Sequence, residues 1–454
     1  MQLRQLSLLL ALSAMPLAAA ADDADIRALR EELARLRANY EKRIDALEQR
    51  LAEAEAKATA TRADNLGGAP AAVPTTAAPA GGANAFNPNV SLILSGLYSN
   101  LSRDPAGYRI TGYKLPNAVL DQNKPQRGFS LTESELGISA NIDPLFYGAL
   151  AFAVHPDDTV STEEAFIQTT SLPQGFTLKA GRWFSGIGYL NEQHAHTWDF
   201  VDAPLAYVAF LGGQFNNDGL QLRWLAPTDT FIELGAELGR GAAYPGTGRD
   251  KNGSGASAVF AHLGGDLGTS HSWRAGLSYL TTAPRGRQWD DVDALGAAVT
   301  NGFSGSSRLW IVDGVWKWAP DGNPARRNFK LQGEYLRRKE DGTLAYNQAT
   351  PGRYVASQSG WYVQGAYQFD PAWRVGLRTE RLSAGGVDYG VNNAVLLRPD
   401  FAPRRNALML DWNPSEFSRV RFQLAQDRSR EGVVDNQFFV QYQMSLGAHG
   451  AHRF

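Results

Sequence analysis

The residues of this chain whose types and spacing could bind a metal gather in one stretch, Glu192-Gln193-His194-Ala195-His196, which Asp199 follows. In an extended segment His194 and His196 point the same way, and imidazole nitrogens are ligands that suit zinc, copper or nickel. The other interpretation is that the two histidines are ordinary polar loop residues that pack against neighbouring aromatics. We predict no cofactor and no metal, with His194 and His196 kept as a speculative metal site.

Composition excludes several other function classes. The 454 residues contain no cysteine, so neither a disulfide framework nor a thiolate metal site is available. The net charge of −2 offers no basic field for binding nucleic acid. None of the seven histidines lies in a recognisable nucleophile motif, so we predict that the protein is not an enzyme.

The first residues predict export. Arg4 supplies a positive charge, residues 6–12 an apolar core, and residues 18–21 a small-residue cleavage zone, which is typical of a signal peptide over residues 1–21. A membrane-anchoring helix is the alternative, although the apolar run is short for one. No later window of about 20 apolar residues follows, so any crossing of a membrane must use strands.

Residues 22–60 have the pattern of a short coiled coil. Apolar residues from Ile26 to Leu51 recur at steps of three and four, with one extra step of four. A single helix cannot bury such a stripe, which favours self-association, and packing on another partner is the alternative. Residues 61–88 are mostly Ala, Pro, Gly and Thr, which predicts a flexible linker.

From residue 89 the hydrophobic period is two rather than 3.6, as where Trp361, Val363 and Tyr367 alternate with polar or small residues. Seven short turns alternate with eight other, mostly longer connections, which predicts 16 antiparallel strands. The last strand closes on Phe454, which resembles the assembly signal of bacterial outer-membrane β-barrels. We therefore predict an all-β transmembrane barrel over residues 89–454, with a soluble exported β protein as the alternative.

The order of coiled coil, linker and barrel resembles the phosphate-selective porin O and P family, and so do the stretches Leu178–Phe184 and Asn141–Pro144. The resemblance covers most of the mature chain. It implies a homotrimer of separate pores, with the coiled coil in the periplasm. It also implies a long loop that folds inward and narrows each pore, which in this chain would lie near residues 184–217.

That loop lacks the cations that a phosphate filter needs. Residues 183–222 contain no Lys or Arg, whereas an anion that sheds water must be compensated by fixed donors. The candidate constriction residues are instead Glu192, His194, His196, Asp199 and Asp202. By strand parity, the candidate residues of the lumen wall are Lys179, Arg223, Arg274, Lys330, Arg374, Arg378, Arg419, Arg421, Glu233, Glu237, Asp313, Glu334 and Glu380.

The predicted function is passive diffusion of small hydrophilic or ionic solutes through a water-filled channel in the bacterial outer membrane. One alternative is an anion or phosphate channel that uses the wall arginines. The other is a structural envelope protein tethered through its coiled coil. The expected partners are outer-membrane lipid, the solutes or ions themselves, and two further copies of the chain.

Overall fold

The computed structural model describes residues 88–248, 250–398 and 400–447, all within one compact unit. The predicted signal peptide, the coiled coil, nearly all of the linker and Phe454 lie outside the described residues. Within the described ranges, none of the helices has the length and apolar content to cross a membrane.

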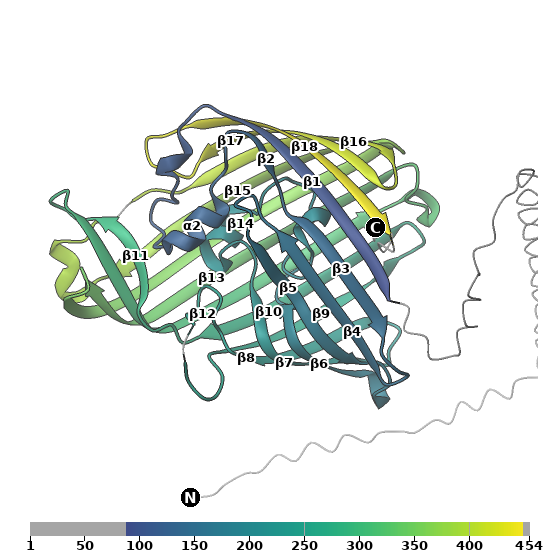
Figure 1. Cartoon of the computed structure of the whole chain (residues 1–454), viewed down its shortest axis with the longest axis horizontal. Coiled ribbons are helices and arrows are strands. Elements are labelled where there is room, and N and C mark those ends of the chain that lie inside the picture. The colour runs from purple at the N-terminus through teal and green to yellow at the C-terminus, as the bar shows by residue number, and fades with distance from the viewer. Residues whose placement is uncertain (1–87, 249, 399, 448–454) are drawn as a thin grey trace, which may run out of the picture. The chain divides into compact units, whose positions relative to one another are not determined.

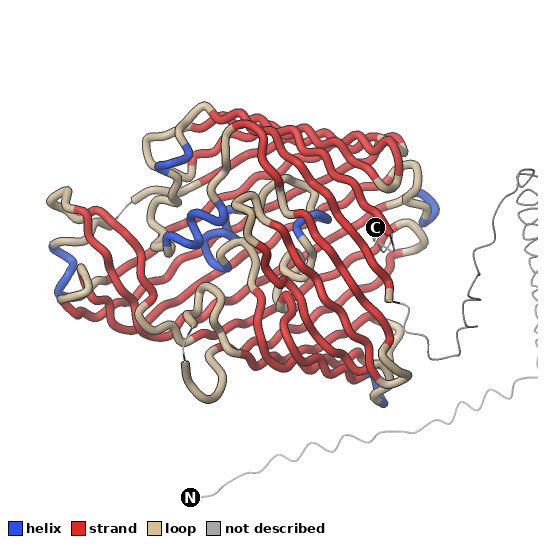
Figure 2. The backbone as a smooth tube through the Cα atoms, viewed as in Figure 1, coloured by secondary structure: helices blue, strands red, loops and turns tan. Residues whose placement is uncertain are grey.

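The described chain consists almost entirely of antiparallel strands joined in one sheet (Figure 2). Two short α-helices, α2 (Asn117–Asn123) and α3 (Leu205–Leu211), lie in connecting segments. The strands are β1 (Asn89–Leu101), β2 (Gly128–Leu131), β3 (Ser134–Asn141), β4 (Phe146–Val154), β5 (Val160–Thr169), β6 (Phe176–Phe184), β7 (Asn216–Leu225), β8 (Phe231–Gly239), β9 (Ala256–Leu267), β10 (His271–Thr282), β11 (Arg287–Val292), β12 (Ala298–Trp318), β13 (Asn328–Tyr346), β14 (Thr350–Asp370), β15 (Trp373–Asp388), β16 (Arg404–Ser415), β17 (Ser418–Arg428) and β18 (Asp435–Gly447).

The sheet closes on itself because the first strand pairs with the last, with Leu94 opposite Met444 (Figure 1). β2 and β3 both pair with β1, and β10 and β11 both pair with β12, so each couple acts as one interrupted strand. Counting each couple once turns the 18 strands of the sheet into a closed 16-stranded barrel. The predicted barrel of about 16 antiparallel strands is therefore confirmed.

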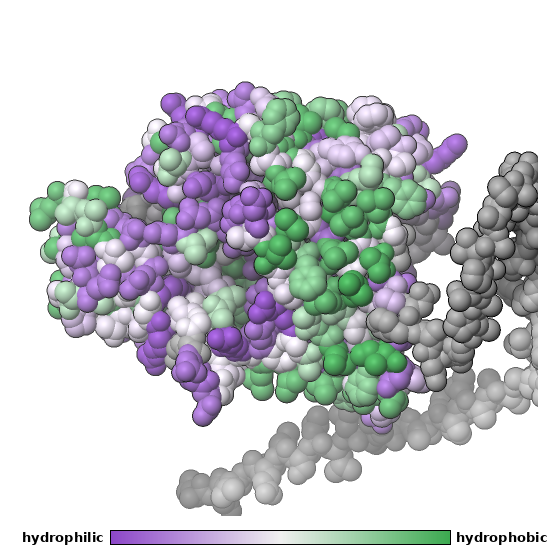
Figure 3. Space-filling view, viewed as in Figure 1, coloured by the Kyte–Doolittle hydropathy of each residue, from purple (hydrophilic) through white to green (hydrophobic). Residues whose placement is uncertain are grey.

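Neighbouring residues alternate between an apolar outer face and a buried, largely polar inner face. In β15 Leu377 is 65% exposed whereas Arg378 is 3% exposed, and in β17 Leu424 is 55% exposed whereas Gln423 is fully buried. Apolar residues gather on the part of the surface toward the arrowhead of β18, and hydrophilic residues dominate the part that carries β11 (Figure 3). An exposed apolar band of this kind is stable against lipid and costly in water.

From the sequence, residues 283–306 and 339–358 are expected to be two of the longer polar connections, and both expectations were wrong. Residues 283–306 are mostly strand, in β11 and β12, and residues 339–358 are strand except for a turn at 347–349. β12 and β14 each reach 21 residues, about twice the 9–11 that a bilayer requires. In the extension the apolar residues Phe303, Leu344 and Tyr354 pack in a buried cluster, whereas the alternate positions are mostly small or polar, so the apolar outer face of a membrane strand is missing.

The membrane-facing assignment predicts a large cost for a charge at Leu377. This residue lies four positions after the start of β15, about 13 Å along the strand at about 3.3 Å per residue. Leu377→Arg is expected to lower the free energy of unfolding by about 2–4 kcal/mol, because it places an uncompensated cation near the bilayer midplane. Equilibrium urea unfolding in lipid vesicles measures the change.

The control for this substitution is Leu295→Arg. Leu295 is 88% exposed in the turn between β11 and β12, so its variant is expected to change stability by no more than about 0.5 kcal/mol. Equal costs at the two positions would contradict the lipid-facing assignment of Leu377.

Candidate functional site

The connection between β6 and β7, residues 185–215, lies inside the barrel and is called the inward loop below. It contains α3, whose seven residues are all buried. Pro204 precedes the helix, and Gly212 ends it in the left-handed conformation, with its N–H donating to the Tyr207 and Val208 carbonyl oxygens. A helix that is apolar on every side needs a fully buried environment, which only the barrel interior offers here.

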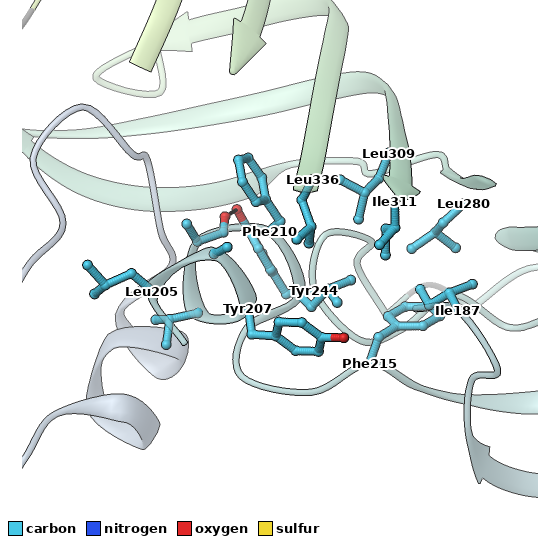
Figure 4. Packing of buried hydrophobic residues seen from close by; sticks show 14 of the residues in the cluster. Ile187, Leu205, Tyr207, Phe210, Phe215, Tyr244, Leu280, Leu309, Ile311 and Leu336 are labelled. Atoms are coloured by element: carbon cyan, nitrogen blue, oxygen red, sulfur yellow. Dashed lines mark hydrogen bonds between the residues drawn. The ribbon is translucent and has the colours of Figure 1, made fainter. Parts of the chain in front are cut away.

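An apolar patch on the inner wall receives α3. Leu280 of β10, Leu309 and Ile311 of β12 and Leu336 of β13 are each no more than 1% exposed and belong to the same hydrophobic cluster as the helix. Figure 4 shows these side chains gathered with Phe210 and Tyr207 of α3. Strand parity predicts a largely polar inner face, so this apolar patch is an exception. The sequence feature that could have indicated it is the continuous apolar run at 309–312.

Two carboxylates of the inward loop join it to arginines and a lysine of the wall. Asp199 lies 2.5 Å from Lys330 Nζ and 3.2 Å from Arg374 Nη2. Asp202 lies 2.6 Å from Arg378 Nη2 and 2.6 Å from Arg405 Nη1. Burial acts to raise the pKa of Asp199, but Lys330 and Arg374 outweigh it and hold that pKa well below its usual range. These two residues, the anchor carboxylates, therefore neutralise wall cations.

Two glutamates of the wall, one on β8 and one on β13, accept hydrogen bonds from backbone and side-chain donors of the inward loop. Glu237 of β8 accepts from Ser185 Oγ at 2.6 Å and from the Gly186 N–H at 2.9 Å. Glu334 of β13 accepts from the Leu190 N–H at 2.9 Å and from the Tyr207 and Tyr362 hydroxyls. The inward loop is thus attached to the wall at several points around the circumference.

Another segment from the N-terminal connection covers the inward loop. Ile110, Tyr113, Leu115 and Val119 of residues 102–127 are buried in the cluster that includes α3. The Tyr113 hydroxyl donates to the carbonyl oxygens of Ser359 and Ser383, 2.9 Å from each. Sequence reasoning missed this segment as part of the interior, and its few apolar residues gave only a weak signal.

The residues between 192 and 199 whose types could bind a metal contact different parts of the wall. Glu192 pairs with Arg223 of β7, and Asp199 pairs on the far side with Lys330. His194 and His196 instead meet Glu135 of β3, and His194 also meets Glu163 and Glu164 of β5. Burial acts to lower the pKa of His194, but hydrogen bonds to the three glutamates outweigh it and hold that pKa well above its usual range.

The candidate wall residues all face the interior side of their strands but differ in their partners. Arg421 forms a two-point ion pair with Asp411, at 2.7 and 2.9 Å, and Arg374 approaches the same carboxylate at 2.8 Å. Glu233 pairs with Arg223 and His262, and Glu380 pairs with Arg378 and Arg405. Arg274 lies 3.7 Å from Asp313 and donates to the Gly188 carbonyl oxygen at 2.8 Å.

Two wall cations contact other groups. Lys179 Nζ lies 4.1 Å from the Phe166 ring centroid, and Arg419 donates to the His196 carbonyl oxygen and to Gln443. Within the described ranges neither forms an ion pair with a carboxylate at 4.0 Å or less. Most of the positive charge that the sequence places on the wall is therefore compensated by the inward loop or by neighbouring strands.

Comparison with known proteins identifies relatives in sequence and in fold. No protein-family profile matches the chain. An uncharacterised protein of Aquifex aeolicus is 30% identical over 397 residues, which is 82% of this chain and 80% of that protein. A loop L8 deletion mutant of OmpT, an outer membrane protein of Vibrio cholerae, superposes with a TM-score of 0.50 at 10% identity, over 79% of this chain and 99% of that one.

An anion-selective porin from Comamonas acidovorans is also similar, with a TM-score of 0.47 at 10% identity, over 79% of this chain and 99% of that one. At these identities the likeness to solved structures is one of fold. The sequence relation is stronger, and the chain belongs to the same family as the Aquifex aeolicus protein, with a closed 16-stranded β-barrel as its own fold.

Proposed function

We propose that the protein is an outer-membrane porin through which small hydrophilic or ionic solutes diffuse passively. The observation that carries this function is the closed barrel with an apolar outer face, a charged inner wall and a loop anchored across the interior. Such a barrel spans a bilayer without exposing backbone polar groups to lipid. The inward loop would then set the width that is left for solutes.

Weak ion selectivity is the expectation that follows from the ion pairs. Arg374, Arg378 and Arg405 each contact a carboxylate within 3.2 Å, so their charges are locally balanced. A balanced pair creates little field at the distance of a passing ion, and water screens what remains. The pore would therefore favour neither sign of ion strongly.

A channel with anion preference is the second candidate. Lys179 and Arg419 are the observation that favours it, because neither has a carboxylate at ion-pair distance among the described residues. The loop carboxylates that oppose it are committed to wall cations. Phosphate selectivity of the kind found in the porin O and P family would require further cations at the narrowest point, and the inward loop supplies none.

Purified full-length protein in planar bilayers tests the proposed function. We expect stepwise conductance increments, and a reversal potential in a KCl gradient that corresponds to a permeability ratio within about fivefold of one. This bound follows because a lone charge 4 Å from an ion in water contributes about 1 kcal/mol. Membranes that stay silent at every protein concentration would contradict the channel, and a strong preference for chloride would establish the anion-selective candidate instead.

The homotrimer, the periplasmic coiled coil and membership of the porin O and P family belong to the same proposal. They are supported by the heptad-like pattern at residues 22–60 and by the order of helix, linker and barrel along the chain. The structural envelope function would use the same helix as a tether, and it differs from the porin because it needs no conducting path.

A further inference from the structure

Two histidines and several glutamates meet where the inward loop touches β3 and β5. The 3₁₀ turn Ala195–Thr197 holds His194 and His196 close together, with ring centroids 5.6 Å apart. Glu135 and His196 are each 7% exposed, so the cluster lies inside the barrel rather than on its surface. Porin function as proposed above does not require these residues.

The spacing of the donor atoms matches the coordination sphere of a small divalent ion. Glu135 Oε2 lies 2.9 Å from His194 Nδ1 and 3.1 Å from His196 Nδ1. One donor atom from each of the three residues lies within 4.8 Å of the other two. Metal–ligand bonds of about 2.0–2.2 Å place adjacent donor atoms about 3.0–3.5 Å apart, so little rearrangement is needed to admit the ion.

A second carboxylate stands where it would orient one of the imidazoles. Glu164 Oε2 lies 3.1 Å from His194 Nε2, on the side of the ring away from the shared Glu135 oxygen. Metal-ligating histidines commonly donate their other ring N–H to a carboxylate in this way, which fixes the tautomer and the ring direction. Glu163 Oε2, 3.2 Å from His194 Nδ1, is near enough to complete a fourth ligand position.

The cluster also carries more negative charge than its protein partners balance. Glu133, Glu135 and Glu163 form a second triad of the same close spacing, in which the Glu133 side chain is hydrogen-bonded to Glu163. In the part of the chain that the structure describes, none of these three carboxylates forms an ion pair with Lys or Arg. Such an excess is costly in a buried site unless a cation compensates it.

We propose that Glu135, His194 and His196, with Glu163 beside them, bind one divalent first-row transition metal ion, with Zn²⁺ as the best fit to a site of two imidazoles and carboxylates. The ion clamps the inward loop to β3 and β5. Glu192 and Asp199, which adjoin the histidines in sequence, take no part because their partners are Arg223 and Lys330.

The test is a direct measurement of metal binding by the full-length protein without a polyhistidine tag. The protein is refolded in detergent in the presence of a chelator, transferred to chelator-free buffer and titrated with Zn²⁺ by calorimetry, and in parallel with Co²⁺ by visible absorption. We expect one ion per chain and Co²⁺ ligand-field bands. Glu164→Gln is expected to weaken binding by about 10–100-fold, because it removes only the partner that orients His194.

His194→Gln/His196→Gln is expected to abolish the site, and His155→Gln/His271→Gln is the control with the same number of histidines removed. His155 contacts Ser161 beside the turn between β4 and β5, and His271 stacks on Trp316, so neither side chain supplies a donor to the cluster. Absence of stoichiometric binding by the wild-type protein would overturn the proposal in favour of a protonated His194 that balances the glutamates by itself. Binding retained by the double variant would overturn it too.

If the double variant does not fold, the X-ray absorption spectrum of the Zn²⁺-loaded wild-type protein shows whether imidazoles ligate the ion. Two imidazole ligands support the site, and a spectrum without imidazole scattering overturns it. Conductance is not a readout in these experiments, so their outcome is independent of whether the barrel is a channel.

Discussion

The double substitution Asp199→Asn/Asp202→Asn is expected to release the inward loop from the wall and to raise the single-channel conductance. Asp199 and Asp202 together contact four wall cations, at separations between 2.5 and 3.2 Å. Removing one side of a buried ion pair costs about 3–5 kcal/mol, since it leaves charges in the interior without compensation. A loss of that size shifts the balance between anchored and released loop by about two to three and a half orders of magnitude, at about 1.4 kcal/mol per factor of ten.

The measurement is the conductance step in planar bilayers, together with its noise, since a released loop fluctuates in the lumen. Asp157→Asn/Asp266→Asn is the matched control, because it removes the same charge from two exposed carboxylates, one in the turn between β4 and β5 and one near the end of β9. If Asp199→Asn/Asp202→Asn has the same single-channel conductance as the wild-type protein, these ion pairs do not limit the width of the pore. Retention of the heat-resistant folded band on gel electrophoresis separates release of the loop from loss of the barrel.

The substitution Asp411→Ala is expected to be the most destabilising single change in the barrel wall. Asp411 is fully buried and accepts two hydrogen bonds from Arg421, itself 1% exposed, and one from Arg374. Without the carboxylate, the acceptor left to Arg421 among the described residues is the Trp198 carbonyl oxygen, at 2.8 Å. An uncompensated buried charge of this kind lowers the free energy of unfolding by about 3–5 kcal/mol, which urea unfolding in detergent or vesicles measures.

Two further variants make the test of Asp411 specific. Asp411→Leu/Arg421→Met removes both charges at once, and it is expected to recover most of the lost stability because an apolar pair needs no compensation. Arg404→Ala removes an exposed arginine from the same strand, β16, and is expected to change stability by about 0.5 kcal/mol or less. A double variant as unstable as Asp411→Ala would show that the cost lies in lost packing rather than in the buried charge.

The barrel and its strand faces could be predicted from the sequence because both are local properties. Leu377 and Arg378 are adjacent in sequence, and a strand must send them to opposite faces whatever the rest of the chain does. The prediction from alternation failed at residues 283–306 and 339–358, where strand extends beyond the expected membrane band and its outer face is no longer apolar. It failed again at Leu309 and Ile311, where the inner wall is apolar because α3 covers it.

The partners of the charged residues could not be predicted in the same way. Asp202 meets Arg378 and Arg405, which follow it by more than 170 residues and lie on different strands. Sequence parity places these arginines inside the barrel, but it holds no information on which loop residue reaches them. The same limit applies to Glu135, which joins His194 and His196 from a strand that precedes them by some 60 residues and was not among the candidate site residues.

By itself, the sequence determined that the chain folds into a barrel with about 16 strands, which residues of a strand face inward, and that the loop near 184–217 is acidic. Only the tertiary structure decided that the carboxylates of this loop form ion pairs with cations of the wall. It also decided that an apolar helix fills part of the interior, and that the two histidines face glutamates of β3 and β5. The physical reason is that alternation follows from backbone geometry over two or three residues. Ion pairs and ligand clusters depend instead on closing loops of tens to hundreds of residues.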